Sequence, residues 1–275
     1  MRQRATSAAV LVPLLLVVVA IGGPVLALAV AIVAAIAAIE VFALLRAAGH
    51  APFTALGTAL TLVVVFDAVV PNVLDGSGLL LGAVGIVLVA VASFAKPEPR
   101  DGLDAWMATV FGALYVSLLS FILRLAHAAP AIPAGSPLAE LGAERDWVLL
   151  LILAVWAYDT GAYLVGRNFG RTRFLTNLSP SKTVEGLAGG VVAATVVVGI
   201  MLWALGQDPL HAIALGPLTA LAAQAGDLAE SMIKRAADAK DSGTLIPGHG
   251  GMLDRVDSFL FAAPVVTLYV LAILS

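Results

Sequence analysis

The chain has 275 residues, of which 61% are hydrophobic and 12% are charged, and its formal net charge is −3. A water-soluble domain is about 45–50% apolar and about 25% charged, so this composition excludes that class of protein. The absence of cysteine excludes disulfides, thiolate metal sites and cysteine nucleophiles, and the balance of charges argues against bulk binding of nucleic acid.

Nine apolar stretches predict membrane-spanning α-helices, because about 20 mainly apolar residues cross the hydrocarbon core of a bilayer. In chain order they cover residues 8–21, 24–45, 53–70, 79–94, 106–125, 147–165, 186–205, 210–229 and 256–274. Their continuous runs of Leu, Ala and Val lack the alternation of a membrane β-barrel. The predicted fold is therefore an all-α polytopic integral membrane protein. The first stretch follows the basic sequence MRQR, so a signal peptide is an alternative interpretation of it.

The distribution of basic residues predicts a cytoplasmic N-terminus. Lys and Arg gather on the cytoplasmic side of membrane proteins, and in this orientation only Arg124 and Arg145 of the 15 basic residues lie outside. The predicted location is the cell membrane, which in a bacterium is the inner membrane. Residues 1–146 are predicted to form a transmembrane scaffold, and residues 147–275 are predicted to carry a site on the cytoplasmic side.

Two acidic residues of the predicted scaffold, Glu40 and Asp67, lie within apolar stretches. An ionised carboxylate inside a membrane is costly and often marks a functional site. Each of these acids is isolated in the sequence, with no other polar group nearby. We therefore interpret both as structural.

The first polar segment covers residues 156–190. Its loop contains four cations and no acid between residues 166 and 183: Arg167, Arg171, Arg173 and Lys182. A basic cytoplasmic loop can be a topology signal alone, but the hydroxyl groups of Ser179 and Thr183 beside Lys182 favour phosphate binding. Asp159 lies within the predicted sixth span, where a carboxylate is either paired structurally or part of a site.

The second polar segment covers residues 226–258. A stripe of polar side chains shares one helix face there at spacings of three or four: Asp227, Glu230, Ser231 and Lys234. A glycine-rich loop follows, whose exposed amides could wrap phosphates, and Asp254 and Asp257 lie where the last predicted helix begins. Carboxylates beside cations match the needs of phosphoryl or nucleotidyl transfer. The alternative is a solvated loop with offsetting charges, and His249 could be a phosphate contact, a general acid or a turn residue.

The sequence SMIKRAADAKDSGTLIPGHGGMLDRVDS resembles the signature of the phosphatidate cytidylyltransferases, also called CDP-diacylglycerol synthases. The matching positions are Ser231, Lys234, Arg235, Lys240, Asp241, Gly243, Pro247, His249, Gly250, Gly251, Asp254, Arg255 and Asp257. The runs YDTGAY, SPSKTVEG and GDLAES also resemble motifs of this family, so the resemblance covers residues 156–258. The chain departs from the pattern at Ser181, Val184 and Asp238, where the family commonly has Lys, an aromatic residue and Gly.

The resemblance implies a transfer of the cytidylyl group from CTP to phosphatidate, which gives CDP-diacylglycerol and pyrophosphate and requires Mg²⁺. On this basis the catalytic residues are Asp227, Lys234, Arg235, Lys240, Asp241, His249, Asp254 and Arg255. The substrate-binding residues are Asp159, Ser179, Lys182, Thr183, Ser231, Gly250 and Gly251. The expected metal ligands are Asp227 and Asp254, with Asp257 as a third.

Two other functions remain as alternatives. A CTP-dependent lipid kinase of the dolichol or phytol kinase type would transfer the terminal phosphoryl group of CTP to an alcohol. A polytopic transporter would use the intramembrane acids as coupling sites. The expected partners are CTP, phosphatidate and the membrane, without nucleic acid, and the sequence leaves open both a monomer and a homodimer.

Overall fold

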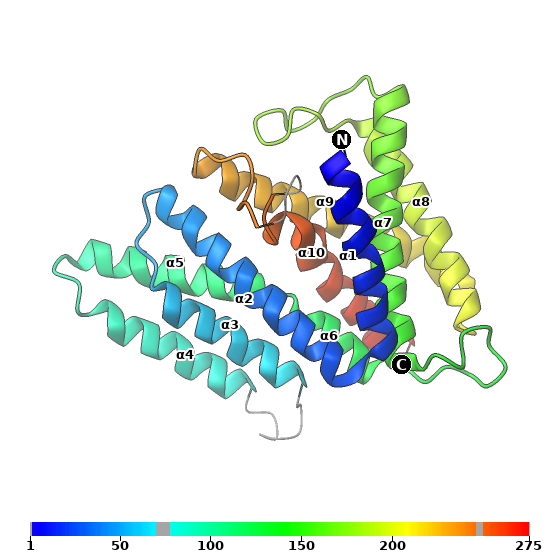
Figure 1. The fold of residues 1–275 in the computed structure, drawn as a ribbon, viewed down its shortest axis with the longest axis horizontal. Coiled ribbons are helices and arrows are strands. Elements are labelled where there is room, and N and C mark those ends of the chain that lie inside the picture. The colour runs from blue at the N-terminus through cyan, green and yellow to red at the C-terminus, as the bar shows by residue number, and fades with distance from the viewer. Residues whose placement is uncertain (1, 70–77, 246–249, 275) are drawn as a thin grey trace. The chain divides into compact units, whose positions relative to one another are not determined.

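The computed structural model describes residues 2–69, 78–245 and 250–274, and within these ranges the chain forms helices and no β-strand (Figure 1). The helices are α1 (Arg2–Ile21), α2 (Gly23–Ala47), α3 (Thr54–Val69), α4 (Gly78–Ser93), α5 (Pro99–Ser117), α6 (Ser120–Ala128), α7 (Ala143–Phe169), α8 (Val184–Ala204), the 3₁₀ turn η1 (Pro209–His211), α9 (Ala212–Ala236), α10 (Leu253–Tyr269) and the π-helical η2 (Val270–Leu274). The predicted all-α fold is confirmed for this part of the chain.

Six helical segments in the described residues are long and apolar enough to cross a membrane. They are Gly23–Ala47, Pro99–Ala128, Ala143–Phe169, Val184–Ala204, Pro209–Ala236 and Leu253–Leu274. Three shorter apolar helices, Ala9–Ile21, Thr54–Val69 and Leu81–Ser93, coincide with the other predicted spans. These findings fit a multi-pass membrane protein, while the count of nine spans and the side of the N-terminus stay predictions.

The predicted fifth span is interrupted in the structure, where α5 and α6 take the place of one helix. The amide of Leu119 donates to the carbonyl of Val116, three residues earlier, at 3.1 Å. The hydroxyl of Ser117 donates to the carbonyl of Ala113 at 2.6 Å. Serine hydroxyls that bond back to the preceding turn compete with the backbone, and this contact lies at the last residue of α5.

Contacts divide the chain into two compact units. The first comprises Met1–Val18, Gly23–Leu123 and Met232–Val256, and the second comprises Val19–Gly22, Arg124–Ser231 and Asp257–Ser275. The segment Met232–Val256, which holds the end of α9 and the start of α10, therefore groups with helices of the N-terminal half. The predicted division at residue 146 distinguishes a scaffold from a region that carries the site, and it does not describe units of contact. It stays a prediction.

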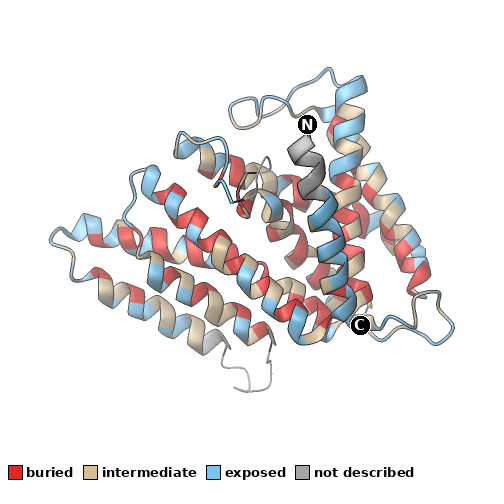
Figure 2. Cartoon of the chain, viewed as in Figure 1, coloured by how far each residue is buried: buried red, intermediate tan, exposed pale blue. Residues whose placement is uncertain are grey.

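In the first unit, α2 packs against α3 and α5. Phe42 of α2 is fully buried, and its ring occupies the space that Gly57 of α3 and Gly112 of α5 leave open, since a Cβ at either glycine would meet ring atoms. Figure 2 shows buried residues along much of α2. Burial of such a ring contributes about 1.5–3 kcal/mol, and it fixes α2 near Glu40.

In the second unit, α7 packs closely along α8 through small residues. A Cβ on Gly161 of α7 would approach the carbonyl of Gly189 to 2.9 Å, so the two backbones nearly touch. Small residues permit this close approach between helices in a membrane. Tyr158 of α7 is fully buried and its hydroxyl lies 2.5 Å from Oε1 of Gln224 on α9. The contact of α7 with α8 fixes the start of α8, where the basic loop ends.

Replacing Gly190 of α8 with alanine is expected to destabilise the fold by about 1–3 kcal/mol, the usual cost of overpacking. The added Cβ would lie 2.6 Å from Cδ2 and 2.8 Å from the carbonyl oxygen of Tyr158. The carbonyl belongs to the backbone of α7 and cannot rotate away. Thermal unfolding in detergent measures the effect as a lower Tm. The matched control is Gly82→Ala in α4, where a Cβ meets nothing within 4 Å, and equal Tm values for the two variants would contradict the packing argument.

Candidate active site

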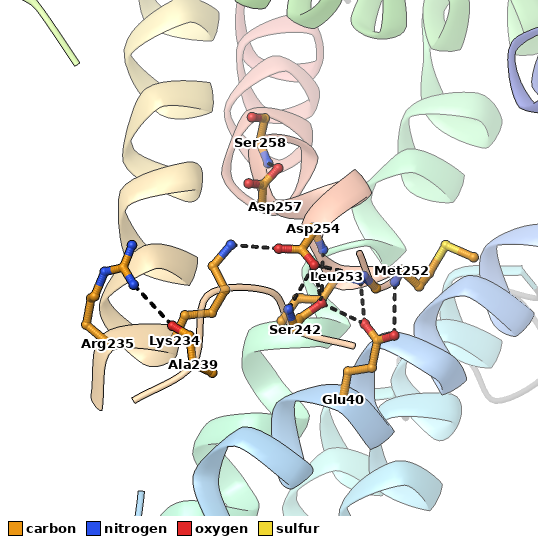
Figure 3. A network of polar contacts seen from close by, with 11 residues as sticks. Glu40, Lys234, Arg235, Ala239, Ser242, Met252, Leu253, Asp254, Asp257 and Ser258 are labelled. Carbon is orange, nitrogen blue, oxygen red and sulfur yellow. Dashed lines mark hydrogen bonds and ion pairs between the residues drawn. The ribbon is translucent and has the colours of Figure 1, made fainter. Parts of the chain in front are cut away.

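Asp254, near the start of α10, is the centre of a hydrogen-bonded cluster in the first unit (Figure 3). Its Oδ2 accepts hydrogen bonds from the amide of Ser242 at 2.8 Å, the hydroxyl of Ser242 at 2.9 Å and the amide of Gly251 at 2.8 Å. Its Oδ1 accepts from Nζ of Lys234 at 2.7 Å. The side chains of Lys234 and Asp254 are only 12% and 6% exposed. Asp254 therefore ties together two parts of the loop before α10, at Ser242 and Gly251, and holds the ammonium group of Lys234 on α9.

Glu40 of α2 binds the same loop from the N-terminal half of the chain. Its Oε1 accepts from the amide of Met252 at 3.0 Å, and its Oε2 accepts from the amide of Leu253 at 2.7 Å and the hydroxyl of Ser242 at 3.0 Å. A carboxylate is stabilised at this position because the N-terminus of a helix carries unpaired N–H groups and partial positive charge. Figure 3 shows the carboxylate of Glu40 facing these donors.

Sequence analysis missed the contact of Glu40 with the site, because it treated this acid as structural. The available signal was the cost of a carboxylate in an apolar span. It also missed Ser242, whose side chain is buried and links Glu40 to Asp254. No local pattern could have joined them, since Ser242 is 202 residues from Glu40.

Lys182 and Asp227 form an ion pair in the second unit, between the basic loop and α9. Both side chains are partly exposed, at 25% and 23%. Oδ2 of Asp227 makes this contact, and within the described ranges no hydrogen bond reaches its Oδ1. The pair joins a residue of the first predicted polar segment to a residue of the second, so the structure brings these two segments together.

The basic loop is closed by the residues that begin α8. The hydroxyl of Thr183 accepts from the amide of Gly186 at 3.1 Å and caps the helix. The carboxylate of Glu185 accepts from the amides of Arg171 at 3.0 Å and Thr172 at 3.1 Å. Glu185 was not among the predicted site residues. Its carboxylate, in the first turn of α8, binds the backbone just after α7 and so closes the loop that contains Lys182.

The remaining predicted site residues differ in exposure and in their contacts. Asp159, Arg235, Lys240, Asp241 and Arg255 are exposed, whereas Ser231 is buried. Arg235 donates to the carbonyl of Ala239 at 3.2 Å, and Asp257 accepts from the amide of Ser258 at 2.7 Å. Ser179 accepts through its carbonyl from the amide of Lys182 at 3.3 Å, and Gly250 has a φ of 78°. His249 lies outside the described residues.

The described residues include no group of three His, Asp or Glu side chains that could hold a metal ion. The role of Asp227, Asp254 and Asp257 as metal ligands therefore stays a prediction. Mg²⁺ does not require such a cluster, since it is commonly bound by one or two carboxylates, water and substrate phosphates. Asp227 fits that mode because its Oδ1 accepts no hydrogen bond from a described residue. Asp254 fits less well, because its two oxygens already accept four hydrogen bonds.

Comparison with known proteins relates the whole chain, and not only its polar segments, to one family. The family described as the cytidylyltransferase family matches residues 2–273. A phosphatidate cytidylyltransferase of Synechocystis sp. is 36% identical over 292 residues, which cover 99% of this chain and 97% of that protein. A phosphatidate cytidylyltransferase of Bacillus subtilis is 45% identical over 121 residues, which cover 43% of this chain and 45% of that protein. The chloroplastic phosphatidate cytidylyltransferase 5 of Arabidopsis thaliana is 32% identical over 272 residues, which cover 92% of this chain and 67% of that protein.

Proposed function

The chain belongs to the cytidylyltransferase family, and from that premise we propose that it transfers the cytidylyl group of CTP to phosphatidate. The products are CDP-diacylglycerol and pyrophosphate, and the process is phospholipid biosynthesis. The observation that carries this proposal is the similarity to the Synechocystis enzyme over 97% of that protein's length. The two lysine–carboxylate pairs support it, since they supply cations at the positions where the motifs of the family lie.

The reaction needs no activated side chain, because the phosphate group of phosphatidate is already anionic. One of its oxygens attacks the α-phosphorus of CTP, the bond from that phosphorus to the bridging oxygen breaks, and pyrophosphate leaves with the electron pair. The protein contributes position and charge neutralisation, which are the main terms in such transfers. Lys182 and Lys234 are held by Asp227 and Asp254, so their ammonium groups stay directed when the reacting phosphates arrive. Arg235, Lys240 and Arg255 are exposed and can contact outer phosphate oxygens.

The proposal includes a requirement for Mg²⁺. Asp227 would hold the ion together with substrate phosphates, and Asp254 and Asp257 are the further candidates. A bound Mg²⁺ would neutralise charge on the phosphates of CTP. The ion pair of Asp227 with Lys182 would then keep the carboxylate oriented for a ligand on its other oxygen.

The direct test is turnover of CTP labelled at the α-phosphate, in detergent, with phosphatidate and with or without Mg²⁺. The expected result is label in the lipid product only when all three components are present. Label that enters lipid from the γ-phosphate instead would indicate a CTP-dependent lipid kinase. A purified, folded protein that consumes no CTP under any of these conditions would contradict the proposal.

We further propose that the site faces the cytoplasm, and the native absence of cysteine makes the test direct. A cysteine introduced by Thr244→Cys, at an exposed position of the loop before α10, is expected to resist a membrane-impermeant maleimide in sealed right-side-out vesicles and to react after permeabilisation. The matched control is Ala134→Cys, exposed in the loop between α6 and α7, which is expected to react in both conditions. The reverse pattern would place the site outside.

A further inference from the structure

We infer that Glu40 is a positioning residue of this active site: it holds the loop that ends at α10 and, through Ser242, sets the positions of Asp254 and Lys234. This inference rests on the proposed function. It assigns a role in the reaction to a helix of the N-terminal half, for which the motifs of the C-terminal half give no indication. The contacts of Glu40 are with the loop, so its effect would pass through the loop.

The first line of support is the number of donors that Glu40 satisfies. The amides of Met252 and Leu253 donate to its two carboxylate oxygens at 3.0 and 2.7 Å, and the hydroxyl oxygen of Ser242 lies 3.0 Å from Oε2. Glu40 is only 9% exposed, so these bonds are largely shielded from water. A buried donor that loses its acceptor costs about 1–3 kcal/mol, and removal of Glu40 would take the acceptor from two neighbouring backbone amides of one short loop.

The second line of support is the fit of the loop around the carboxylate. A Cβ on Gly243 would lie 2.7 Å from Oε1 of Glu40, and a Cβ on Gly251 would lie 2.6 Å from the same atom. These two positions therefore accept only glycine while Glu40 keeps its place. Two glycines that both approach one carboxylate oxygen this closely indicate that the backbone of this loop is shaped to Glu40.

The third line of support is the single proton of Ser242. Its hydroxyl lies 3.0 Å from Oε2 of Glu40 and 2.9 Å from Oδ2 of Asp254, and it can donate to only one of them at a time. Ser242 thus connects the two carboxylates, and the amide of Asp254 lies 3.3 Å from the same hydroxyl oxygen. A shift of Ser242 after loss of Glu40 would move Asp254, which is the acceptor of Lys234. The ammonium group of Lys234 is one of the cations proposed to neutralise the phosphates.

The test compares Glu40→Gln with Thr109→Val. Glutamine has the same shape as glutamate, but its NH₂ end must face at least one of the N–H donors. Thr109 is a matched control because it is buried in the same unit and its hydroxyl accepts from the amide of Phe53 at 2.8 Å, away from the loop. Glu40→Gln is expected to lower kcat by at least about tenfold, which is 1.4 kcal/mol in the barrier, with a smaller change in KM for CTP. Thr109→Val is expected to lower Tm by a similar amount and to leave kcat within about twofold, a factor worth less than 0.5 kcal/mol.

Two further measurements separate positioning from a general loss of stability. Amide hydrogen exchange of the peptide that contains Met252 and Leu253 is expected to quicken in Glu40→Gln and to be unchanged in Thr109→Val. The double variant Glu40→Gln/Ser242→Ala is expected to be no slower than the worse single variant, since the inference has Glu40 act on Asp254 through Ser242. A kcat for Glu40→Gln equal to that of Thr109→Val, or effects that multiply in the double variant, would overturn the inference. A folded wild-type protein without activity would instead refute the proposed function, and the positioning role with it. Unchanged amide hydrogen exchange at Met252 and Leu253 in Glu40→Gln would refute the contact of Glu40 with the loop, whatever the activity.

Discussion

Asp254→Asn is expected to lower the turnover of CTP and phosphatidate by about 10²–10³-fold, the range seen when one preorganised charge-stabilising group is lost from an active site. Asparagine keeps the shape of the side chain but has one acceptor end instead of two. Its NH₂ group would then face either Lys234, which now reaches Oδ1, or the three donors that now reach Oδ2. Lys234 would also lose the negative charge of Asp254, which now lies 2.7 Å from its Nζ in a largely buried position. Steady-state turnover with labelled CTP measures the loss.

The control for Asp254→Asn must separate lost chemistry from lost stability. Removal of one partner of a buried ion pair is more destabilising than replacement of both, so Asp254→Asn/Lys234→Met is expected to recover part of the Tm without recovering turnover. Asp208→Asn is the neutral comparison, because Asp208 is exposed and only caps η1 through the amide of Leu210. Turnover near the wild-type value in a folded Asp254→Asn protein would remove this carboxylate from the site.

The helices and the polar segments could be predicted from the sequence because both depend on local patterns. Apolar length determined each predicted span, and each has a helix in the described chain. The break between α5 and α6 was not predicted, because residues 106–125 form one mainly apolar stretch in the sequence. Hydropathy alone does not distinguish a serine that faces solvent from one that bonds to its own helix.

The pairings within the site could not be predicted, although most of the paired residues could. Lys182, Asp227, Lys234 and Asp254 all stood out as charged groups near the membrane face, yet 45 positions separate Lys182 from Asp227. Which of these residues pair depends on how the helices pack, and the spacing of residues along one helix does not reveal that packing. Glu40 was harder, because it lies in an apolar helix and its three donors belong to a loop more than 200 residues away. Two of those donors are backbone amides, which no side-chain pattern can reveal.

Lys182→Ala is expected to lower kcat/KM for CTP by about 10²-fold, equivalent to about 2.7 kcal/mol of transition-state stabilisation, and to leave the fold intact. The ammonium group is partly exposed and is paired with the partly exposed Asp227, so its removal costs little stability. The loop itself is closed by Thr183 and Glu185, which the substitution leaves in place. Initial rates over a range of CTP concentrations measure the change.

The charge-reversed pair Lys182→Asp/Asp227→Lys decides whether this contact serves stability or chemistry. An ion pair of either polarity can join the basic loop to α9, so a purely structural pair predicts that the double variant regains both Tm and turnover. A site that must present an ammonium group from the loop and a carboxylate from α9 to two anionic substrates has no such symmetry. We therefore expect the double variant to regain Tm and to remain inactive, and recovered turnover would show that the pair is a structural link.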